Sequence, residues 1–240
     1  MKVMTFNIQH ARNFVTGEID YPLMAKTITD LGADIVGLNE VYGAGKLSPF
    51  RSQDDKIAGK LGKEWAHYFA RAIKLKGGSY GNGIVTRYGI LDVETIPLIS
   101  PPKTHPGYYE DRCILKALLD TPEGKVRFMT CHFGLQPEEE ALAAETICKV
   151  LDEDKKNGLP TVLMGDFNVT PDNPVLDPIR ERLIDTDAFC EGPHLSFPTD
   201  KPNIKIDYIF VSVHFKVTSC VVPAVVAADH LPVVAEITLK

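Results

Sequence analysis

Residues 160–168 read PTVLMGDFN, and this stretch decides the fold that we predict. Its apolar run predicts a buried strand, and Gly165 lets the chain bend sharply where that strand ends. Asp166 and Asn168 follow two positions apart, so their side chains are expected to point the same way. A plain turn is the alternative, because Asp and Asn favour turns for local reasons.

The same strand pattern recurs along the chain, as apolar residues that alternate or run together between turn signals. Strands are predicted at residues 3–8, 33–41, 67–73, 81–88, 91–99, 112–120, 125–133, 204–212, 215–223 and 231–239. The turn Thr121-Pro122-Glu123-Gly124 joins two of them and predicts a hairpin.

Four segments predict helices. The first follows Asp20, which caps it, and stops before Gly32. The second runs through Leu61 and begins with Ser52 and Asp55 as a capping box. The others lie at residues 137–156 and 173–183. Many strands interleaved with few helices predict an α/β (α+β) sandwich, in which two sheets pack together and helices cover their outer faces. No repeat or linker marks a boundary, so we expect a single domain over residues 1–240.

The composition indicates a globular protein with one sizeable core, since 44% of the 240 residues are hydrophobic and 24% are charged. The net charge of -6 disfavours a nucleic-acid partner, although a local basic patch could serve one. Five scattered cysteines lack the spacing of a zinc site and are expected to be reduced thiols. No stretch has the length of a transmembrane segment or the pattern of a signal peptide, so we expect a cytoplasmic protein with no implied protein partner.

Polar residues stand at the ends of the predicted strands. Each has a local explanation, such as a turn or a solvated strand end, but packed strands bring their ends to a common edge. We therefore expect the set to meet in one cleft. Crowded carboxylates require a neutralising cation or protons, and oxygen ligands without thiolates favour Mg²⁺ or Mn²⁺. The set comprises Asn7, Glu40, His132, Asp166, Asn168, Asp207, Asp229 and His230.

Seven short motifs carry a resemblance that covers almost the whole chain. They are MTFNI (4–8), GLNEV (37–41), GNGIVTR (81–87), TCHFG (130–134), GDFN (165–168), IDYIF (206–210) and DHLPV (229–233). In this order they resemble the endonuclease/exonuclease/phosphatase superfamily, the DNase I-like phosphoesterases. The resemblance implies a four-layered sandwich of two packed mixed β-sheets flanked by helices.

The resemblance also implies a role for each strand-end residue. Glu40 is the principal metal ligand, with Asn7 and Asp229 near the ion. Asp166 activates the attacking water and Asn168 holds the phosphate. His230 contacts the scissile phosphate, and Asp207 fixes its tautomer. His132 donates to a phosphate oxygen, Asn82 is its polar partner, and Arg112 lies against the phosphate.

Two segments near these motifs have open interpretations. Tyr108 belongs to the loop SPPKTHPGYY (100–109), which either lines the rim of the pocket and stacks on a substrate group or is a plain connector. Ser196-Phe197-Pro198 resembles a short element that precedes the catalytic Asp in relatives.

The resemblance implies a metal-dependent hydrolase of phosphoesters, and the residue types suit that reaction. Because no serine or cysteine nucleophile has a paired base, we expect one in-line attack of water. Gln9 and His132 depart from the pattern of abasic-site nucleases, which favours phosphodiesters of small molecules or lipid head groups as substrates. A nuclease with the same chemistry is the alternative, and Arg71, Lys74 and Lys76 either track phosphates or solubilise an edge strand. A third alternative is a binding module that has lost catalysis.

Overall fold

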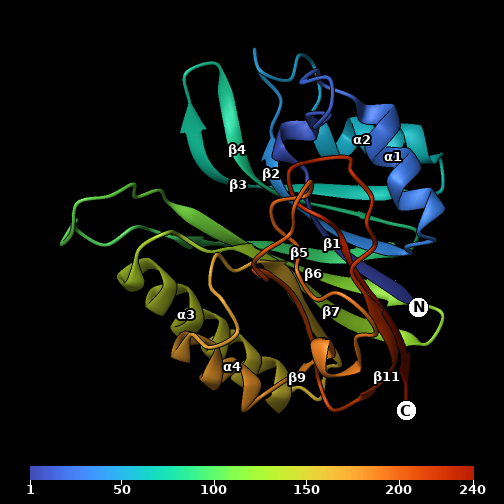
Figure 1. Ribbon diagram of the computed structural model, residues 1–240. Coiled ribbons are helices and arrows are strands. Elements are labelled where there is room, and N and C mark those ends of the chain that lie inside the picture. The colour runs from blue at the N-terminus through green and yellow to red at the C-terminus, as the bar shows by residue number, and fades with distance from the viewer.

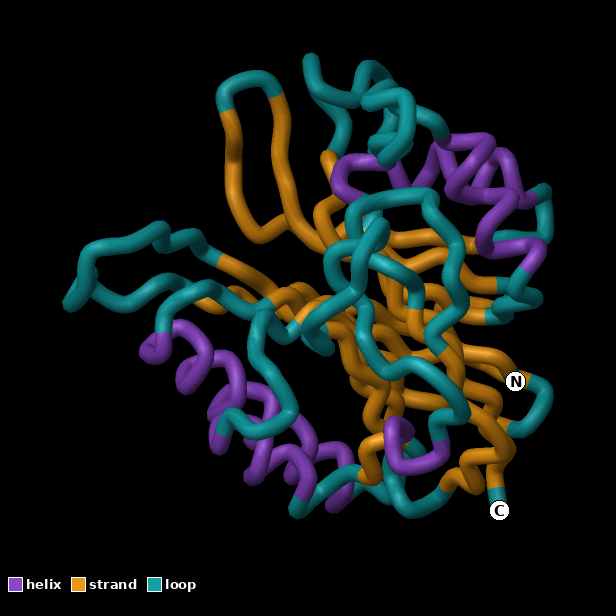
Figure 2. The backbone as a smooth tube through the Cα atoms, viewed as in Figure 1, coloured by secondary structure: helices purple, strands orange, loops and turns teal.

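The computed structural model describes the whole chain, from Met1 to Lys240. Two six-stranded sheets pack face to face, and helices cover both outer faces (Figure 1). Figure 2 shows the strands gathered in the middle and the helices on the two outer surfaces. The predicted sandwich of two mixed sheets flanked by helices is thus confirmed.

The first sheet has the strand order β11-β12-β1-β2-β4-β3. Only β1 and β2 run parallel, and the other neighbours are antiparallel. Its strands are β1 (Lys2–Asn7), β2 (Ile35–Tyr42), β3 (Ala66–Leu75), β4 (Gly78–Thr86), β11 (Phe215–Val221) and β12 (Val233–Leu239).

The second sheet has the order β5-β6-β7-β8-β10-β9, and only β7 and β8 run parallel. The predicted hairpin is confirmed, since Thr121 of β6 pairs with Gly124 of β7. The two-residue strand β9 was not predicted. The strands are β5 (Gly89–Leu98), β6 (Arg112–Thr121), β7 (Gly124–His132), β8 (Thr161–Asp166), β9 (Ile184–Asp185) and β10 (Asp207–Val211).

Four α-helices and three 3₁₀ turns complete the chain: α1 (Tyr21–Asp30), α2 (Gln53–Leu61), α3 (Pro137–Lys156), α4 (Asp177–Arg180), η1 (Gln9–Ala11), η2 (Pro174–Leu176) and η3 (Thr186–Phe189). Asp20 caps α1 as predicted, and its Oδ1 accepts from the Leu23 amide at 2.9 Å. The capping box at Ser52 is wrong, because the Asp55 carboxylate lies 3.5 Å from His67 Nε2 and the Ser52 side chain makes no cap hydrogen bond. The helix expected at residues 173–183 is shorter, with η2 followed by α4.

Three hydrophobic cores fill the three spaces between the four layers. The consecutive residues Val3 and Met4 of β1 belong to different cores, because successive side chains of a strand point to opposite faces. Val3 packs between the sheets, and Met4 packs in the core that includes Ile28 of α1. The third core holds Ile147 of α3 against the second sheet. Burial on both faces explains the nearly continuous apolar runs of the central strands. No helix combines the length and the apolar character needed to cross a membrane.

Two long connections project beyond the sheets on the same side of the molecule (Figure 1). One is the β3–β4 hairpin, and the other is the loop between β5 and β6. Leu75 from the hairpin and Tyr108 from the loop line one cleft together with Glu40 of β2. These connections therefore flank the end of the sandwich where the polar strand ends meet.

Candidate active site

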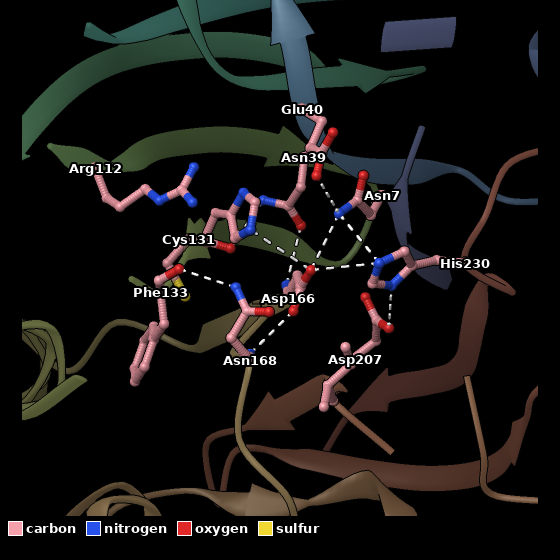
Figure 3. A network of polar contacts seen from close by, with 12 residues as sticks. Asn7, Asn39, Glu40, Arg112, Cys131, Phe133, Asp166, Asn168, Asp207 and His230 are labelled. Carbon is pink, nitrogen blue, oxygen red and sulfur yellow. Dashed lines mark hydrogen bonds and ion pairs between the residues drawn. The ribbon is translucent and has the colours of Figure 1, made fainter. Parts of the chain in front are cut away.

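The predicted strand-end residues meet where the two sheets end side by side (Figure 3). Asn7 ends β1 in the first sheet, while His132 and Asp166 end the parallel pair β7 and β8 in the second. Asp207 begins β10 opposite Asp166, with which it pairs. His230 reaches the same place from the segment before β12. Both sheets are thus needed to assemble the group.

Asp166 is the centre of this group and is 1% exposed. Its Oδ2 accepts from Asn7 Nδ2 at 3.0 Å and lies 3.5 Å from His132 Nε2 and 3.7 Å from His230 Nε2. Burial, and after it the charge of Asp207, raises the pKa of Asp166 to about 7. A carboxyl group with that pKa can both take up and release a proton near neutral pH.

His230 is held by Asp207. Its Nδ1 lies 2.9 Å from Asp207 Oδ2, which also accepts from Ser196 Oγ at 2.6 Å. Burial by itself lowers the pKa of His230, but the charges of Asp207 and Asp166 outweigh burial and raise it to about 10. The Phe197 ring packs against the imidazole of His230, with 4.7 Å between the ring centroids. His230 is therefore a cation whose Nε2 faces Asp166, and the Ser-Phe-Pro element supports it from behind.

His132 has the opposite electrostatic environment. Burial, and then the positive charges of Arg112 and His230, hold the pKa of His132 well below its usual range. The ring is therefore neutral at pH 7 and has one N–H to donate. Asn168 follows β8 with φ of 53°, and its backbone amide donates to Asp166 Oδ1 at 2.9 Å. Its side-chain Nδ2 donates to the Phe133 carbonyl at 3.0 Å, which uses one of the two amide hydrogens.

Glu40 stands at an irregularity of β2. The pairing of β2 with β4 shifts between Leu38 and Val41, and Glu40 has a φ of 58°. Such a bulge re-aims a side chain, here toward the cleft. Glu40 Oε1 accepts from Asn7 Nδ2 at 3.3 Å, and Oε2 lies 3.6 Å from His10 Nε2. The side chain remains 23% exposed, so an ion can reach it.

The donor atoms fit a hard cation. The potential ligand atoms of Asp166, Asp207 and His230 lie within 4.8 Å of one another, but His230 is protonated and bound to Asp207, so the carboxylates are the groups that a cation can use. In addition, Oδ1 of Asp207 and Oδ1 of Asp229 are buried without a hydrogen-bond partner. An unpartnered buried carboxylate oxygen is costly, and a cation removes that cost. Burial raises the pKa of Asp229, as expected for a carboxylate that lacks a positive neighbour close enough to compensate fully.

Arg112 and Tyr108 border an open cleft with a volume of about 330 Å³. Arg112 is buried, and its Nη1 lies 2.5 Å from Glu110 Oε1 and 3.4 Å from the Tyr80 hydroxyl. Its Nε is buried and has no hydrogen-bond partner, so one donor of the guanidinium is left unsatisfied. Tyr108 is 59% exposed at the rim, and its hydroxyl donates to Glu110.

Asn82 lies below the cleft, and its polar atoms are used by the scaffold. Its Nδ2 donates to the Cys113 carbonyl at 2.8 Å, and its Oδ1 accepts from Asn39 at 2.9 Å. It forms no hydrogen bond with His132. The structure therefore places Asn82 as a link between the sheets, and its contact with a substrate stays a prediction.

Two residues of the site were missed from the sequence. Asn39 is fully buried and joins both sheets, because its Nδ2 also donates to the Cys131 carbonyl at 2.8 Å and its Oδ1 accepts from the Asp166 amide at 3.0 Å. His10 stacks on Tyr42, with ring centroids 4.1 Å apart. Their sequence signals were weak: Asn39 merely precedes Glu40, and His10 follows the first strand with no glycine to mark its left-handed backbone.

Comparisons with known proteins point to one family. A model described as the Endonuclease/Exonuclease/phosphatase family matches residues 4–230. The uncharacterized protein YbhP of Escherichia coli K12 is 24% identical over 257 residues, which cover 99% of this chain and 96% of YbhP. An endonuclease/exonuclease/phosphatase from Beutenbergia cavernae superposes with a TM-score of 0.79 at 26% identity, over 100% of this chain and 72% of that one. The mannosyl-6-phosphatase Bt3783 of Bacteroides thetaiotaomicron has a TM-score of 0.79 at 18% identity over 100% of both chains.

Proposed function

The chain belongs to the Endonuclease/Exonuclease/phosphatase family and is a phosphoesterase of that family, and on this premise we propose that it hydrolyses a phosphodiester of a small molecule or a lipid head group with the help of Mg²⁺ or Mn²⁺. One observation carries the proposal. A buried carboxylate, Asp166, lies between a neutral imidazole and a cationic one, at 3.5 Å from His132 and 3.7 Å from His230. This arrangement provides a base and two different donors within reach of one phosphate.

Asp166 acts as the base in the proposed step. Water attacks phosphorus in line with the ester oxygen, and the Asp166 carboxylate takes the water proton. The bond between phosphorus and the ester oxygen breaks, and the leaving oxygen takes a proton from solvent. With a pKa of about 7, Asp166 is strong enough as a base to accept the proton and weak enough to release it afterwards.

The histidines stabilise the charge that develops on the phosphate oxygens. His230 carries its positive charge at neutral pH because Asp207 holds the other ring nitrogen. His132 donates one neutral hydrogen bond, and Asn168 offers its remaining amide hydrogen. Arg112, which lines the cleft, adds a positive charge. These groups are fixed before the reaction starts, which is the arrangement that lowers a phosphoryl-transfer barrier.

The carboxylates would hold the metal ion. Glu40, Asn7 and Asp229 are the proposed ligands, and the unpartnered oxygens of Asp229 and Asp207 support a cation at this place. When bound, Mg²⁺ or Mn²⁺ supplies Lewis-acid polarisation of a phosphate oxygen. The preference for these ions follows from ligands that are all oxygen or amide groups.

Turnover of bis(p-nitrophenyl) phosphate and of its monoester, with Mg²⁺ or Mn²⁺ before and after EDTA, tests the proposal. Asp166→Asn should abolish turnover and leave metal binding largely intact. Asp120→Asn makes the same chemical change on an exposed residue and should leave the rate at the wild-type value. Wild-type kcat in Asp166→Asn would refute the role of the base. Absence of turnover on these esters, on plasmid DNA and on a phospholipid panel would favour a binding module.

Glu40→Gln tests the metal site separately. The substitution keeps the size of the side chain and removes its charge, so the Mn²⁺ dissociation constant measured by calorimetry should rise about tenfold to a hundredfold. Unchanged Mn²⁺ affinity would remove Glu40 from the ligand set. Glu64→Gln, on the exposed segment after α2, is the matched control.

A nuclease with the same chemistry is the second candidate. Arg71 and Lys74 are exposed on β3, an edge strand of its sheet, and Lys76 is exposed in the turn that follows it in the projecting hairpin. Such a row can follow a phosphate backbone. The nuclease gains support if DNA cleavage falls steeply with added salt while a small diester is hydrolysed at an unchanged rate.

A further inference from the structure

The cleft beside Glu40 has a composition that selects what it can bind. It opens between the β3–β4 hairpin and the loop before β6, and aromatic rings form one wall. The His10 ring lies 4.1 Å from Tyr42 and 5.5 Å from Tyr80, measured between centroids. Glu110 and Arg112 contribute charged groups to the lining of the cleft.

Buried hydrogen bonds hold the backbone of the two residues that form the aromatic wall. Gln53 is fully buried, and its Nε2 donates to the His10 carbonyl at 2.6 Å while its Oε1 accepts from the Tyr42 amide at 2.9 Å. One side chain thus holds the backbone of both His10 and Tyr42, whose rings stack. Residues 9 to 11 all have left-handed backbone conformations, with φ values from 42° to 61°, and none is glycine. Strain of this kind persists where the surrounding structure holds a residue in place, and it is concentrated at functional sites.

The charges in the cleft are already balanced. Glu110 binds Arg112 at 2.5 Å and also accepts from the Tyr108 hydroxyl. Glu40 faces the proposed cation. The cleft lining therefore offers no unpaired carboxylate to attract an organic cation, and apart from Arg112 it contains no lysine or arginine to bind a second phosphate. What it offers is aromatic surface together with hydrogen-bond acceptors.

We propose that this cleft binds a neutral, hydroxyl-bearing ring of the substrate, a sugar or a cyclitol, that is esterified to the phosphate at Asp166. The inference rests on the proposed function for the position of the phosphate. The carbon–hydrogen faces of such a ring pack on the aromatic wall, and its hydroxyl groups donate to Glu110 and to the tyrosine oxygens. Arg112, which lines the cleft, places its positive charge beside the phosphate.

Two other ligand classes fit the cleft less well. A nucleic-acid strand carries a phosphate on each side of the reacting one, and the flanking phosphate would lie between Glu40 and Glu110. A choline-like cation would find the aromatic rings but no free carboxylate beside them. A neutral polyol ring can pack on the aromatic side chains of the cleft and donate hydrogen bonds to its acceptor oxygens.

The experiment compares esters that differ only in their hydroxyl groups. Inositol 1-phosphate and cyclohexyl phosphate share a six-membered ring, and each is tested as the monoester and as the methyl diester, with phosphocholine and a dinucleotide as further probes. We expect kcat/KM for the inositol ester to exceed that for the cyclohexyl ester at least about 100-fold, because a site that accepts hydroxyl hydrogen bonds rejects the analogue that lacks them. Equal use of both rings, or preference for phosphocholine or the dinucleotide, would overturn the inference and leave a phosphoesterase.

Variants of Tyr42 test whether the aromatic wall binds the ring of the substrate. Tyr42→Leu removes the ring and should raise KM for the inositol ester about tenfold with little change in kcat, since it removes binding that ground state and transition state share. Tyr42→Phe keeps the ring and removes its oxygen, so its KM should lie between those of the wild type and of Tyr42→Leu. Tyr109→Leu is the matched control, because Tyr109 lines a neighbouring groove beside Pro102 and Lys103 and does not line this cleft. Equal effects of Tyr42→Leu and Tyr109→Leu would contradict the assignment.

A binding measurement separates this inference from the proposed function. If no ester is hydrolysed, the proposed function fails, and calorimetry of inositol 1-phosphate and cyclohexyl phosphate with the Asp166→Asn protein in Mg²⁺ then decides. Tighter binding of the inositol ester supports the cleft assignment. Equal affinities refute it.

Discussion

Replacing Asn39 by alanine should both destabilise the fold and misplace the proposed base. Asn39 is fully buried and makes three hydrogen bonds of 2.8 to 3.0 Å. One goes to Asn82 in its own sheet, and the other two, to the Cys131 carbonyl and from the Asp166 amide, connect the sheets. Asn39→Ala removes all three at once. A buried polar group without its partner costs about 1 to 3 kcal/mol, so the range is about 3 to 9 kcal/mol. Water that enters the vacated space restores some bonds, and we expect a loss of about 3 to 4 kcal/mol.

Urea unfolding followed by fluorescence measures this loss. Trp65 is the single tryptophan and is 6% exposed, so its emission reports the transition. The midpoint should fall at an unchanged m-value, and kcat for a diester should fall at least about tenfold because Asp166 loses the bond to its amide. Asn157→Ala, at the exposed end of α3, should change stability by less than about 0.5 kcal/mol. A loss under about 1 kcal/mol for Asn39→Ala would refute the view that these bonds hold the sheets in register.

Three further predictions concern charge, backbone and pH. Asp207→Asn should lower the pKa of His230, observed by NMR of the ring protons, and should reduce kcat about tenfold to a hundredfold. Gly165→Ala should destabilise by about 3 kcal/mol in urea, because φ is 147° and a Cβ there would lie 1.9 Å from a backbone oxygen. The pKa of His67 is raised, first by its hydrogen bond to Asp54, so its stabilising effect is fully present below about pH 6.5 and is lost as the pH rises through the raised value.

Each of these predictions has a control or an outcome that would contradict it. Gly59→Ala, in α2 with no atom near the added Cβ, should be neutral or stabilising, and an equal loss at both glycines would show that the close approach at Gly165 is not the cause. For His67, the unfolding free energy of wild type minus that of His67→Gln is measured from pH 5.5 to 8.5. A difference that grows with pH would contradict the assigned direction. For Asp207→Asn, an unchanged His230 pKa would show that Asp207 does not set its charge.

Sequence patterns predicted the layers and the converging strand ends because both depend on local order. Alternating and continuous apolar runs define strands, and strands in packed sheets must end together, so Asn7, Asp166 and Asp207 could be assigned to one place. Their protonation states could not be predicted. The low pKa of His132 and the raised pKa of His230 arise from burial and from charges on other strands, which only the folded chain brings together.

The residues that were missed act over long sequence distances or through unusual backbone. Asn39 binds the Asp166 amide across 127 positions, and no local pattern marks such a partner. His10 depends on three successive left-handed residues that glycine would normally indicate. Asn82 was assigned to the substrate side because its motif resembles a family position, whereas the structure directs its amide to Cys113 and Asn39. The capping box failed because Asp55 has a better partner in His67.

The strand order of the first sheet also determines when a newly made chain can become active. β1 lies between β2 and β12, so the first strand synthesised waits for the last before its second edge is paired. The second sheet, by contrast, comes from the continuous stretch of residues 89–211 and can pair while synthesis continues. Asp166 and Asp207 can thus be brought together before synthesis ends, but Asn7 and His230 join them only when β12 pairs in its sheet. The candidate active site is therefore complete only after the last strand of the chain has been made.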